Sequence, residues 1–183
     1  MQQIFLILIL AIASLISGQC IAQEPTHNSE TKEVQTPVPP YHISISKQTM
    51  ELTLYDSNNL VIKHYPIACG KNLGNKVKSG DMRTPEGIFS VQEVVNSSHW
   101  QHDFKDGKGM IAGAYGPYFI RLATPPHRGI GIHGTHDDSS IGTRATEGCI
   151  RMHNSDLREL RPYVEVGMTV EILTSEADQQ ASR

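Results

Sequence analysis

Apolar residues recur with a period of two from about residue 41 onward, and this pattern limits what the chain can fold into. Ile43 and Ile45 alternate with serines, and Leu52 and Leu54 alternate with Thr and Tyr. Successive side chains of a strand point to opposite faces, so this alternation is typical of half-buried β-strands. The turn-forming residues at 56–59 separate this segment from the apolar residues 60–62. The pattern therefore predicts a β-hairpin that continues to residue 69.

Similar signals predict more strands farther along the chain. We expect them at 88–95, 118–122, 129–133 and 170–173, with a long loop at 70–87 and a loop or flap at 96–116. The spacing of Leu157, Leu160 and Tyr163 predicts one short helix over 155–163, with Ser155 as its N-cap. Many short strands with turns between them and one helix indicate a mostly-β fold, a sandwich or a barrel.

The first 40 residues differ in kind from the rest. The apolar run at 4–16 is shorter than the roughly 20 residues of a membrane-spanning helix, but it has the length of a signal-peptide core. We expect a signal peptide at 1–22, or an uncleaved anchor because the first three residues lack Lys and Arg. A lipid anchor on Cys20 is a further alternative, although Gln19 stands where a small residue is expected before a lipidated cysteine. The polar, Pro-rich segment 23–40 predicts a flexible spacer.

Length and charge allow one domain after this spacer. A chain of 183 residues, 38% of them hydrophobic, can bury one ordinary core, which we place at 41–174, followed by a polar tail at 175–183. A net charge of −3 and an aromatic content of 6% argue against a nucleic-acid partner. We expect a membrane contact only through the N-terminal segment, if that segment is uncleaved.

Two short motifs point to chemistry: Ile-His-Gly-Thr at 132–135 and Thr-Glu-Gly-Cys-Ile-Arg at 146–151. A thiol attacks a carbonyl as the thiolate, which needs a nearby base or positive charge. Cys149 is the candidate nucleophile with a lowered pKa, and His133, at a strand end, is its candidate base. Gly148 permits a tight turn that exposes the thiol, and the backbone amides of Gly148 and Cys149 are candidate oxyanion donors. Arg151, two residues later, would share a face with Cys149 on an extended segment.

The two motifs, in this order and near this spacing, resemble the L,D-transpeptidase catalytic domain family, also called YkuD-like. The resemblance covers roughly residues 41–174 and implies a β-sandwich with a small helix near the catalytic loop. It implies that Cys149 is the nucleophile and that His133 is the base. It also implies a substrate-binding set: Arg151 for a carboxylate, with Gly134, Thr135, Thr146 and Tyr118 lining the pocket or orienting His133.

The same resemblance implies an activity and a location. The enzyme would form a thioester on Cys149, release D-Ala and cross-link peptidoglycan stem peptides. It would need no cofactor, would be acylated by carbapenem-type inhibitors, and would act after secretion across the inner membrane, in the periplasm or cell envelope. A hydrolytic member, an L,D-carboxypeptidase or an amidase, is an alternative because the acceptor site cannot be read from the sequence.

One residue departs from the family pattern. Many members have His immediately before the Gly-Cys pair, whereas this chain has Glu147. A two-His arrangement is therefore not expected, and the carboxylate would raise the pKa of the neighbouring thiol. A catalytically inactive peptidoglycan-binding domain is thus a second alternative.

Two structural interpretations compete with a nucleophilic cysteine. Cys69 and Cys149 are an even pair that an oxidising compartment could join as a disulfide. A zinc-stabilised interaction module is the other, with possible ligands His133, His136, Asp137, Cys149 and His153. The spacing of these residues is not a strong metal pattern, and no CxxC or HExxH motif is present. We therefore predict no metal site.

Overall fold

The computed structural model describes residues 39–105 and 107–181. The expected signal peptide or anchor at 1–22, with Cys20, lies outside these residues, as does the spacer up to residue 38. Among the residues described, no helix is long and apolar enough to cross a membrane.

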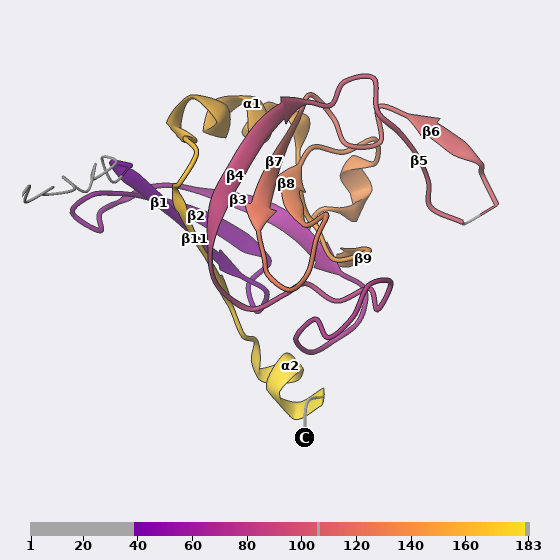
Figure 1. The fold of residues 1–183 in the computed structure, drawn as a ribbon, viewed down its shortest axis with the longest axis horizontal. Coiled ribbons are helices and arrows are strands. Elements are labelled where there is room, and N and C mark those ends of the chain that lie inside the picture. Colours follow the sequence, from indigo (N-terminus) through magenta and orange to yellow (C-terminus); the bar gives the residue numbers. More distant parts are fainter. Residues whose placement is uncertain (1–38, 106, 182–183) are drawn as a thin grey trace, which may run out of the picture. The chain divides into compact units, whose positions relative to one another are not determined.

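Within the described residues, eight strands form a closed barrel (Figure 1). Neighbours around the barrel follow the order β1 (Tyr41–Ser46), β2 (Glu51–Asp56), β3 (Val61–Gly70), β10 (Ile150–Met152), β8 (Gly131–His133), β7 (Tyr118–Ala123), β4 (Gly87–Asn96) and β11 (Thr169–Leu173). β11 returns to β1 in a parallel pair. The predicted mostly-β fold is confirmed. Of the two architectures that the sequence allowed, a sandwich and a barrel, the structure has the barrel.

The short strand β10 closes the barrel. It runs parallel to β8, with Ile150 opposite Ile132, and antiparallel to β3, with Arg151 opposite Ala68. β9 (Arg144–Thr146) pairs with β3 just before this closure. The loop between β9 and β10 therefore sits at the seam of the barrel, and it contains Cys149.

The segment expected as a loop or flap contains a separate hairpin, β5 (Gln101–Asp103) and β6 (Met110–Ala112). We call residues 101–105 and 107–112 the flap. Figure 1 shows it extending from the barrel on the side of β7 and β8.

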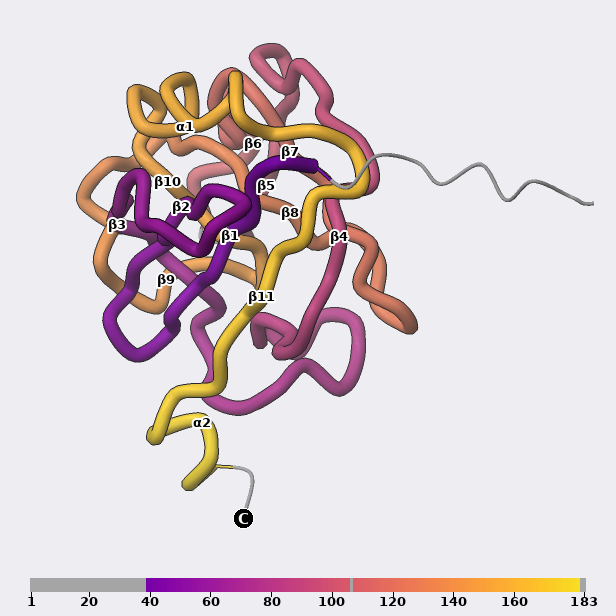
Figure 2. The backbone as a smooth tube through the Cα atoms, turned by 90° about the vertical axis from the view of Figure 1, so that its left-hand side faces the viewer, coloured from indigo at the N-terminus to yellow at the C-terminus, as the bar shows by residue number. Residues whose placement is uncertain are grey.

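Helical segments occupy the two ends of the barrel. α1 (Asn154–Leu160), continued by the 3-10 turn η2 (Arg161–Tyr163), lies at one end and α2 (Glu176–Ala181) at the other, as both views show (Figure 2). The cap of α1 is His153 rather than the predicted Ser155, and no side-chain cap bond forms there. A second 3-10 turn, η1 (Asp138–Ser140), follows β8. The sequence predicted a polar tail at 175–183, and in the structure residues 176–181 of this segment form α2.

The barrel core explains which side chains face the site. Alternate residues such as Ile43, Leu54, Ile120 and Ile132 are fully buried in one apolar cluster, to which α1 adds Leu157 and Leu160. Burying one such side chain stabilises the fold by about 1.5–3 kcal/mol. Phe119 of β7 and His133 of β8 alternate with these core residues and therefore lie on the outer side of the barrel wall, where the candidate active site forms.

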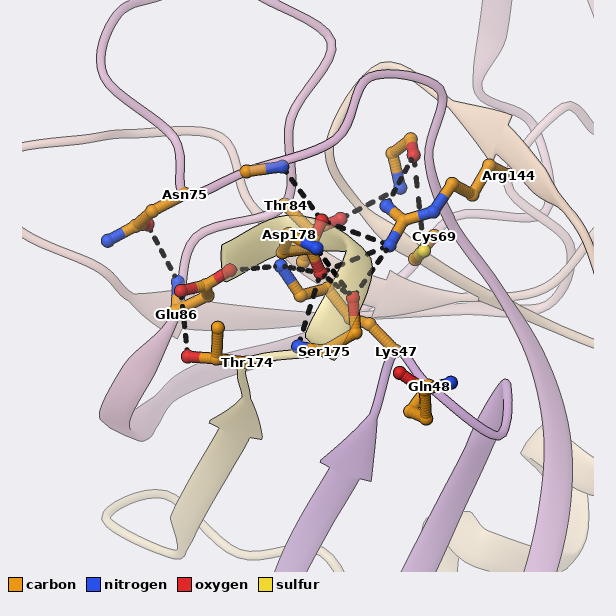
Figure 3. Close-up of polar contacts among 12 residues, drawn as sticks. Lys47, Gln48, Cys69, Asn75, Thr84, Glu86, Arg144, Thr174, Ser175 and Asp178 are labelled. Atoms are coloured by element: carbon orange, nitrogen blue, oxygen red, sulfur yellow. Dashed lines mark hydrogen bonds and ion pairs between the residues drawn. The ribbon is translucent and has the colours of Figure 1, made fainter. Parts of the chain in front are cut away.

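A buried ionic network fixes α2 to β9 and to Lys47 (Figure 3). The carboxylate of Asp178 is fully buried and contacts Lys47 Nζ at 2.9 Å, Arg144 Nη2 at 3.0 Å and the backbone N–H of Gly74 at 2.7 Å. Burial alone would raise the pKa of Asp178, but its hydrogen bonds and Lys47 hold that pKa well below its usual range. Because Arg144 belongs to β9, the network ties α2 to the strand that leads into the loop.

Candidate active site

Cys149 is partly exposed, and its Sγ lies 3.4 Å from the carbonyl oxygen of Gly129. Cys69 is fully buried in the core. Both are free thiols, so the disulfide interpretation is wrong.

The backbone around Cys149 is held by hydroxyl groups. The Thr146 hydroxyl donates to the Cys149 carbonyl at 2.6 Å and accepts the Gly148 N–H at 3.1 Å. The buried Thr84 hydroxyl donates to the Gly148 carbonyl at 3.0 Å and accepts the Gly70 N–H at 2.8 Å. The Gly148 amide is thus committed to the loop in this conformation, which leaves Cys149's own amide as the candidate oxyanion donor.

Gly148 is required by this geometry. Its φ of +133° is a conformation that side chains rarely adopt, and a Cβ there would lie 2.7 Å from the Arg83 carbonyl oxygen. The exposed position of the thiol therefore depends on the absence of a side chain at the preceding residue.

His133 ends β8 and is 3% exposed. Its Nδ1 lies 2.7 Å from the carbonyl oxygen of Gly134. A carbonyl only accepts, so this contact assigns the proton to Nδ1 and leaves Nε2 as the basic nitrogen. Burial lowers the pKa of His133 to about 3, so the ring is neutral at ordinary pH. Phe119 stacks against it with ring centroids 5.6 Å apart.

The thiol is also neutral in the resting site. Burial raises the pKa of Cys149 to about 11, outweighing the Gly131 N–H and the positive charge of Lys76, while Glu147 raises it further. This direction is opposite to the lowered thiol pKa that the sequence predicted. The neutral thiol and the neutral imidazole line the same small cavity.

Arg151 lies opposite His133 on the paired strands and is only 4% exposed. Its Nη1 donates to the Ser140 hydroxyl at 2.9 Å, and its Cζ lies 5.5 Å from the Phe104 ring centroid. Within the described residues its Nε has no hydrogen-bond partner. Arg151 is thus a mostly buried cation that lines the small cavity beside His133, and its role toward a substrate carboxylate stays a prediction.

Gly134 and Thr135 build the scaffold beside His133. A Cβ at Gly134 would lie 3.0 Å from the Gly116 Cα and would collide with the Asn154 side chain. Asn154 Oδ1 accepts the Thr135 N–H at 2.9 Å, and the Thr135 hydroxyl bonds to the backbone of Asp137. These contacts join the end of β8 to the start of α1.

Tyr118 points away from the thiol. Its ring packs against the core, with the Arg161 Cζ 5.9 Å from its centroid. The next residue, Phe119, supplies the aromatic surface of the site instead.

Two cavities meet at Cys149. A cleft of about 480 Å³ includes Trp100, Phe119 and three cations in its lining: Lys76, Arg121 and Arg128. A smaller cavity of about 40 Å³ is lined by His133, Arg151 and the flap residues His102 and Phe104. Tyr115, Glu147 and Cys149 border both. The thiol is therefore reachable from two directions.

Sequence reasoning missed His102, Tyr115, Phe119 and Thr84. The first two belong to a region without clear periodicity, so no pattern marked them. Phe119 is recoverable from strand alternation, because it has the opposite parity to the buried Ile120.

The proposed zinc ligands do not form a cluster. In residues 39–105 and 107–181, no group of three or more His, Cys, Asp or Glu side chains is placed to hold a metal ion. His153 instead contacts Asp138, with Nδ1 and Oδ1 2.7 Å apart.

The sequence and the fold both resemble those of known proteins. The family model YkuD, described as the L,D-transpeptidase catalytic domain, matches residues 40–172. The chain is similar to the Bacillus subtilis protein YkuD, which is named as an L,D-transpeptidase, with 38% identity over 133 residues. That match covers 73% of this chain and 66% of the relative, slightly less than two thirds of its length.

Solved structures share the fold at lower identity. The helical cell shape determining protein Pgp2 (K307A mutant) of Campylobacter jejuni aligns with a TM-score of 0.58 and 22% identity, covering 79% of this chain and 52% of that one. L,D-transpeptidase 3 of Mycobacterium tuberculosis, in complex with a faropenem-derived adduct, aligns with a TM-score of 0.55 and 16% identity, covering 73% and 60%. Identities this low relate the folds alone.

Proposed function

Because the chain belongs to the YkuD family of L,D-transpeptidase catalytic domains, we propose that it is a cysteine acyltransferase that cross-links peptidoglycan stem peptides. The observation that carries the proposal is the position of Cys149 where two cavities meet, with the neutral base His133 lining the smaller one. The larger cavity, of about 480 Å³, can hold the acyl donor beside Cys149.

In the first half-reaction, the Cys149 sulfur attacks the carbonyl at the L-centre of the diamino acid linked to D-Ala. His133 Nε2 takes the thiol proton as the S–C bond forms. The backbone N–H of Cys149 stabilises the oxyanion, an effect typically worth about 10²–10³-fold in rate. When the C–N bond breaks, His133 returns the proton to the departing amine of D-Ala, leaving a thioester.

In the second half-reaction, the side-chain amine of another stem peptide attacks the thioester. His133 accepts a proton from that amine, the C–S bond breaks and the thiol is regenerated. The product is a cross-link between two diamino acids. Water in place of the amine would give an L,D-carboxypeptidase.

The cleft chemistry suits an anionic peptide. Lys76, Arg121 and Arg128 line it beside Cys149. Lys76 and Arg121 also contact Asp81 and Glu93, which orient them, while Arg128 is exposed. Stem peptides carry free carboxylates, to which the exposed Arg128 provides complementary charge, whereas the other two cations are already paired with carboxylates.

The test is mass spectrometry of the purified protein after incubation with tetrapeptide muropeptides. Cross-linked dimers that have lost D-Ala are expected from the wild type. They should be absent with Cys149→Ala and present with Cys69→Ala, a matched control that removes the other described thiol.

Other outcomes would redirect the proposal. Free tripeptide without dimers would indicate a hydrolytic enzyme. Intact muropeptides with the wild-type protein would contradict the acyltransferase and favour a peptidoglycan-binding domain.

Two further parts of the proposal concern inhibitors and location. A carbapenem is expected to acylate Cys149, which an increase in intact mass would show.

We also propose that the protein acts in the periplasm or cell envelope after secretion, where peptidoglycan is accessible. Fractionation of cells that produce the full chain tests this.

A further inference from the structure

A side chain of the flap contacts the loop between β9 and β10, residues 147–149, which contains Cys149. His102 Nε2, on β5, lies 3.3 Å from Glu147 Oε2, two residues before Cys149. Both side chains are partly exposed. We propose that this contact is a latch that holds the flap over Cys149, with His102 and Glu147 as positioning residues; the consequence for acylation rests on the proposed function.

Tyr115 extends the latch toward the catalytic base. Its hydroxyl lies 3.1 Å from His102 Nδ1, and its ring packs edge-on against His133 with centroids 4.9 Å apart. The negative charge of Glu147, 3.3 Å from Nε2, favours the tautomer of His102 with the proton on that nitrogen. Nδ1 then accepts from the Tyr115 hydroxyl. The latch thereby fixes the orientation of the hydroxyl at the border of both cavities.

The inner face of the flap also packs against the site. Phe104 lies edge-on to His102 at 4.5 Å between centroids and stacks on His136 at 5.0 Å. It also covers the guanidinium of Arg151. If the latch opens, these contacts and the walls of the small cavity change together, because His102 and Phe104 line that cavity.

The latch gives Glu147 a function of its own. As an isolated charge, Glu147 would only raise the pKa of the neighbouring thiol. Paired with His102, it anchors a cover for that thiol. The two interpretations predict opposite effects of Glu147→Gln on acylation: faster if the charge acts alone, slower if it anchors the flap.

The first experiment follows the flap without using activity. Trp100 is the single tryptophan of the chain and directly precedes β5, with its ring 5.8 Å from that of Tyr115. Acrylamide quenching of Trp100 fluorescence is expected to increase in His102→Gln and in Glu147→Gln. Lys105→Gln, which breaks the Lys105–Asp103 pair inside the flap, is the matched control and should quench like the wild type. Unchanged quenching in both latch variants would overturn the proposal.

The second experiment compares two reagents for the same thiol. Acylation by a carbapenem should slow about three- to fivefold in each latch variant, the range for the loss of one partly exposed polar contact. Alkylation of Cys149 by iodoacetamide, which needs no ordered cavity, should be unchanged or faster. The double variant should be no slower than the slower single variant, because both remove one contact.

The outcomes separate the latch from the proposed function. Faster acylation in Glu147→Gln, or additive losses in the double variant, would contradict the latch. If the wild-type protein is not acylated at all, the acyltransferase proposal fails, and the quenching result alone decides whether the latch exists.

Discussion

His133 and Arg151 face each other across the parallel pair β8–β10, and both are buried. Burial is the main cause of the low pKa of His133; the bond to Gly134 opposes it, and the positive charge of Arg151 adds to it. Protonating His133 would place a second cation beside a guanidinium in a poorly solvated site. The pairing therefore keeps a base available throughout the neutral pH range.

Alkylation of Cys149 should depend on pH as expected for a thiol of raised pKa. Since that pKa is about 11, the thiolate fraction, and with it the rate of iodoacetamide alkylation, should keep increasing from pH 7 to beyond pH 10. The measurement is the alkylation rate by mass spectrometry in a Cys69→Ala background. A plateau reached below pH 8 would show instead a thiolate–imidazolium pair in the empty site.

Replacing His133 by Gln should slow acylation by about 10²–10⁴-fold, the usual contribution of a general acid–base. The alkylation rate at pH 10, where hydroxide generates thiolate, should change little. Stopped-flow acylation by a carbapenem measures the first quantity. An equal loss in both reactions would point to a displaced thiol rather than a missing base.

Gly148→Ala should destabilise the protein more than Gly142→Ala. Both positions have positive φ, which costs about 1–3 kcal/mol for a side chain, but only at Gly148 does a Cβ collide with backbone; at Gly142 nothing lies within 4 Å. Urea denaturation measures the difference in the free energy of unfolding. Gly142→Ala should retain acylation, whereas Gly148→Ala should lose it. Equal destabilisation would mean that the loop shifts to accept the methyl group.

Thr84→Val should remove two buried hydrogen bonds at nearly constant volume and lower the free energy of unfolding by about 1–3 kcal/mol. It should also slow acylation, because the Gly148 carbonyl loses its donor. Thr53→Val removes a hydroxyl from β2 that contacts His64, and should leave acylation unchanged. The two variants are compared by urea denaturation and carbapenem acylation. Full acylation in Thr84→Val would show that Thr146 alone holds the loop.

Asp178→Asn should destabilise the protein by about 3–5 kcal/mol at pH 7, because Lys47 and Arg144 lose a buried anion. The pKa of Asp178 is lowered on folding, so its stabilisation is complete above the unfolded value of about 3.9 and is lost as pH falls below it. The difference between wild type and variant should therefore shrink from pH 5 to pH 2. A difference that stays constant over this range would contradict the assigned charge.

The strands of the barrel were largely predictable, whereas its closure was not. Residues such as Ile43 and Leu52 show strict alternation, which marks their strands. β9 and β10 are three residues each and too short for a periodic signal. The seam that they form depends on pairing with β3, far away in sequence, and local patterns contain no information on it.

The same distinction holds for the site. Cys149 and His133 stand in recognisable motifs, but the raised pKa of the thiol comes from burial by surrounding residues that no motif specifies. His102 and Glu147 meet only through the tertiary fold, because 45 positions separate them in the sequence. A Glu where the family often has His could be noticed in the sequence, but its partner could not.

The seam has a practical consequence for anyone preparing this protein. Because β10 must pair with both β8 and β3 before Cys149 and His133 can line one cavity, a chain whose barrel remains open has an ordinary, solvated cysteine in place of the nucleophile that we propose. Stoichiometric labelling by a mechanism-based acylating agent would then count correctly folded molecules. Comparing that count with total protein would give the refolding yield of a sample directly.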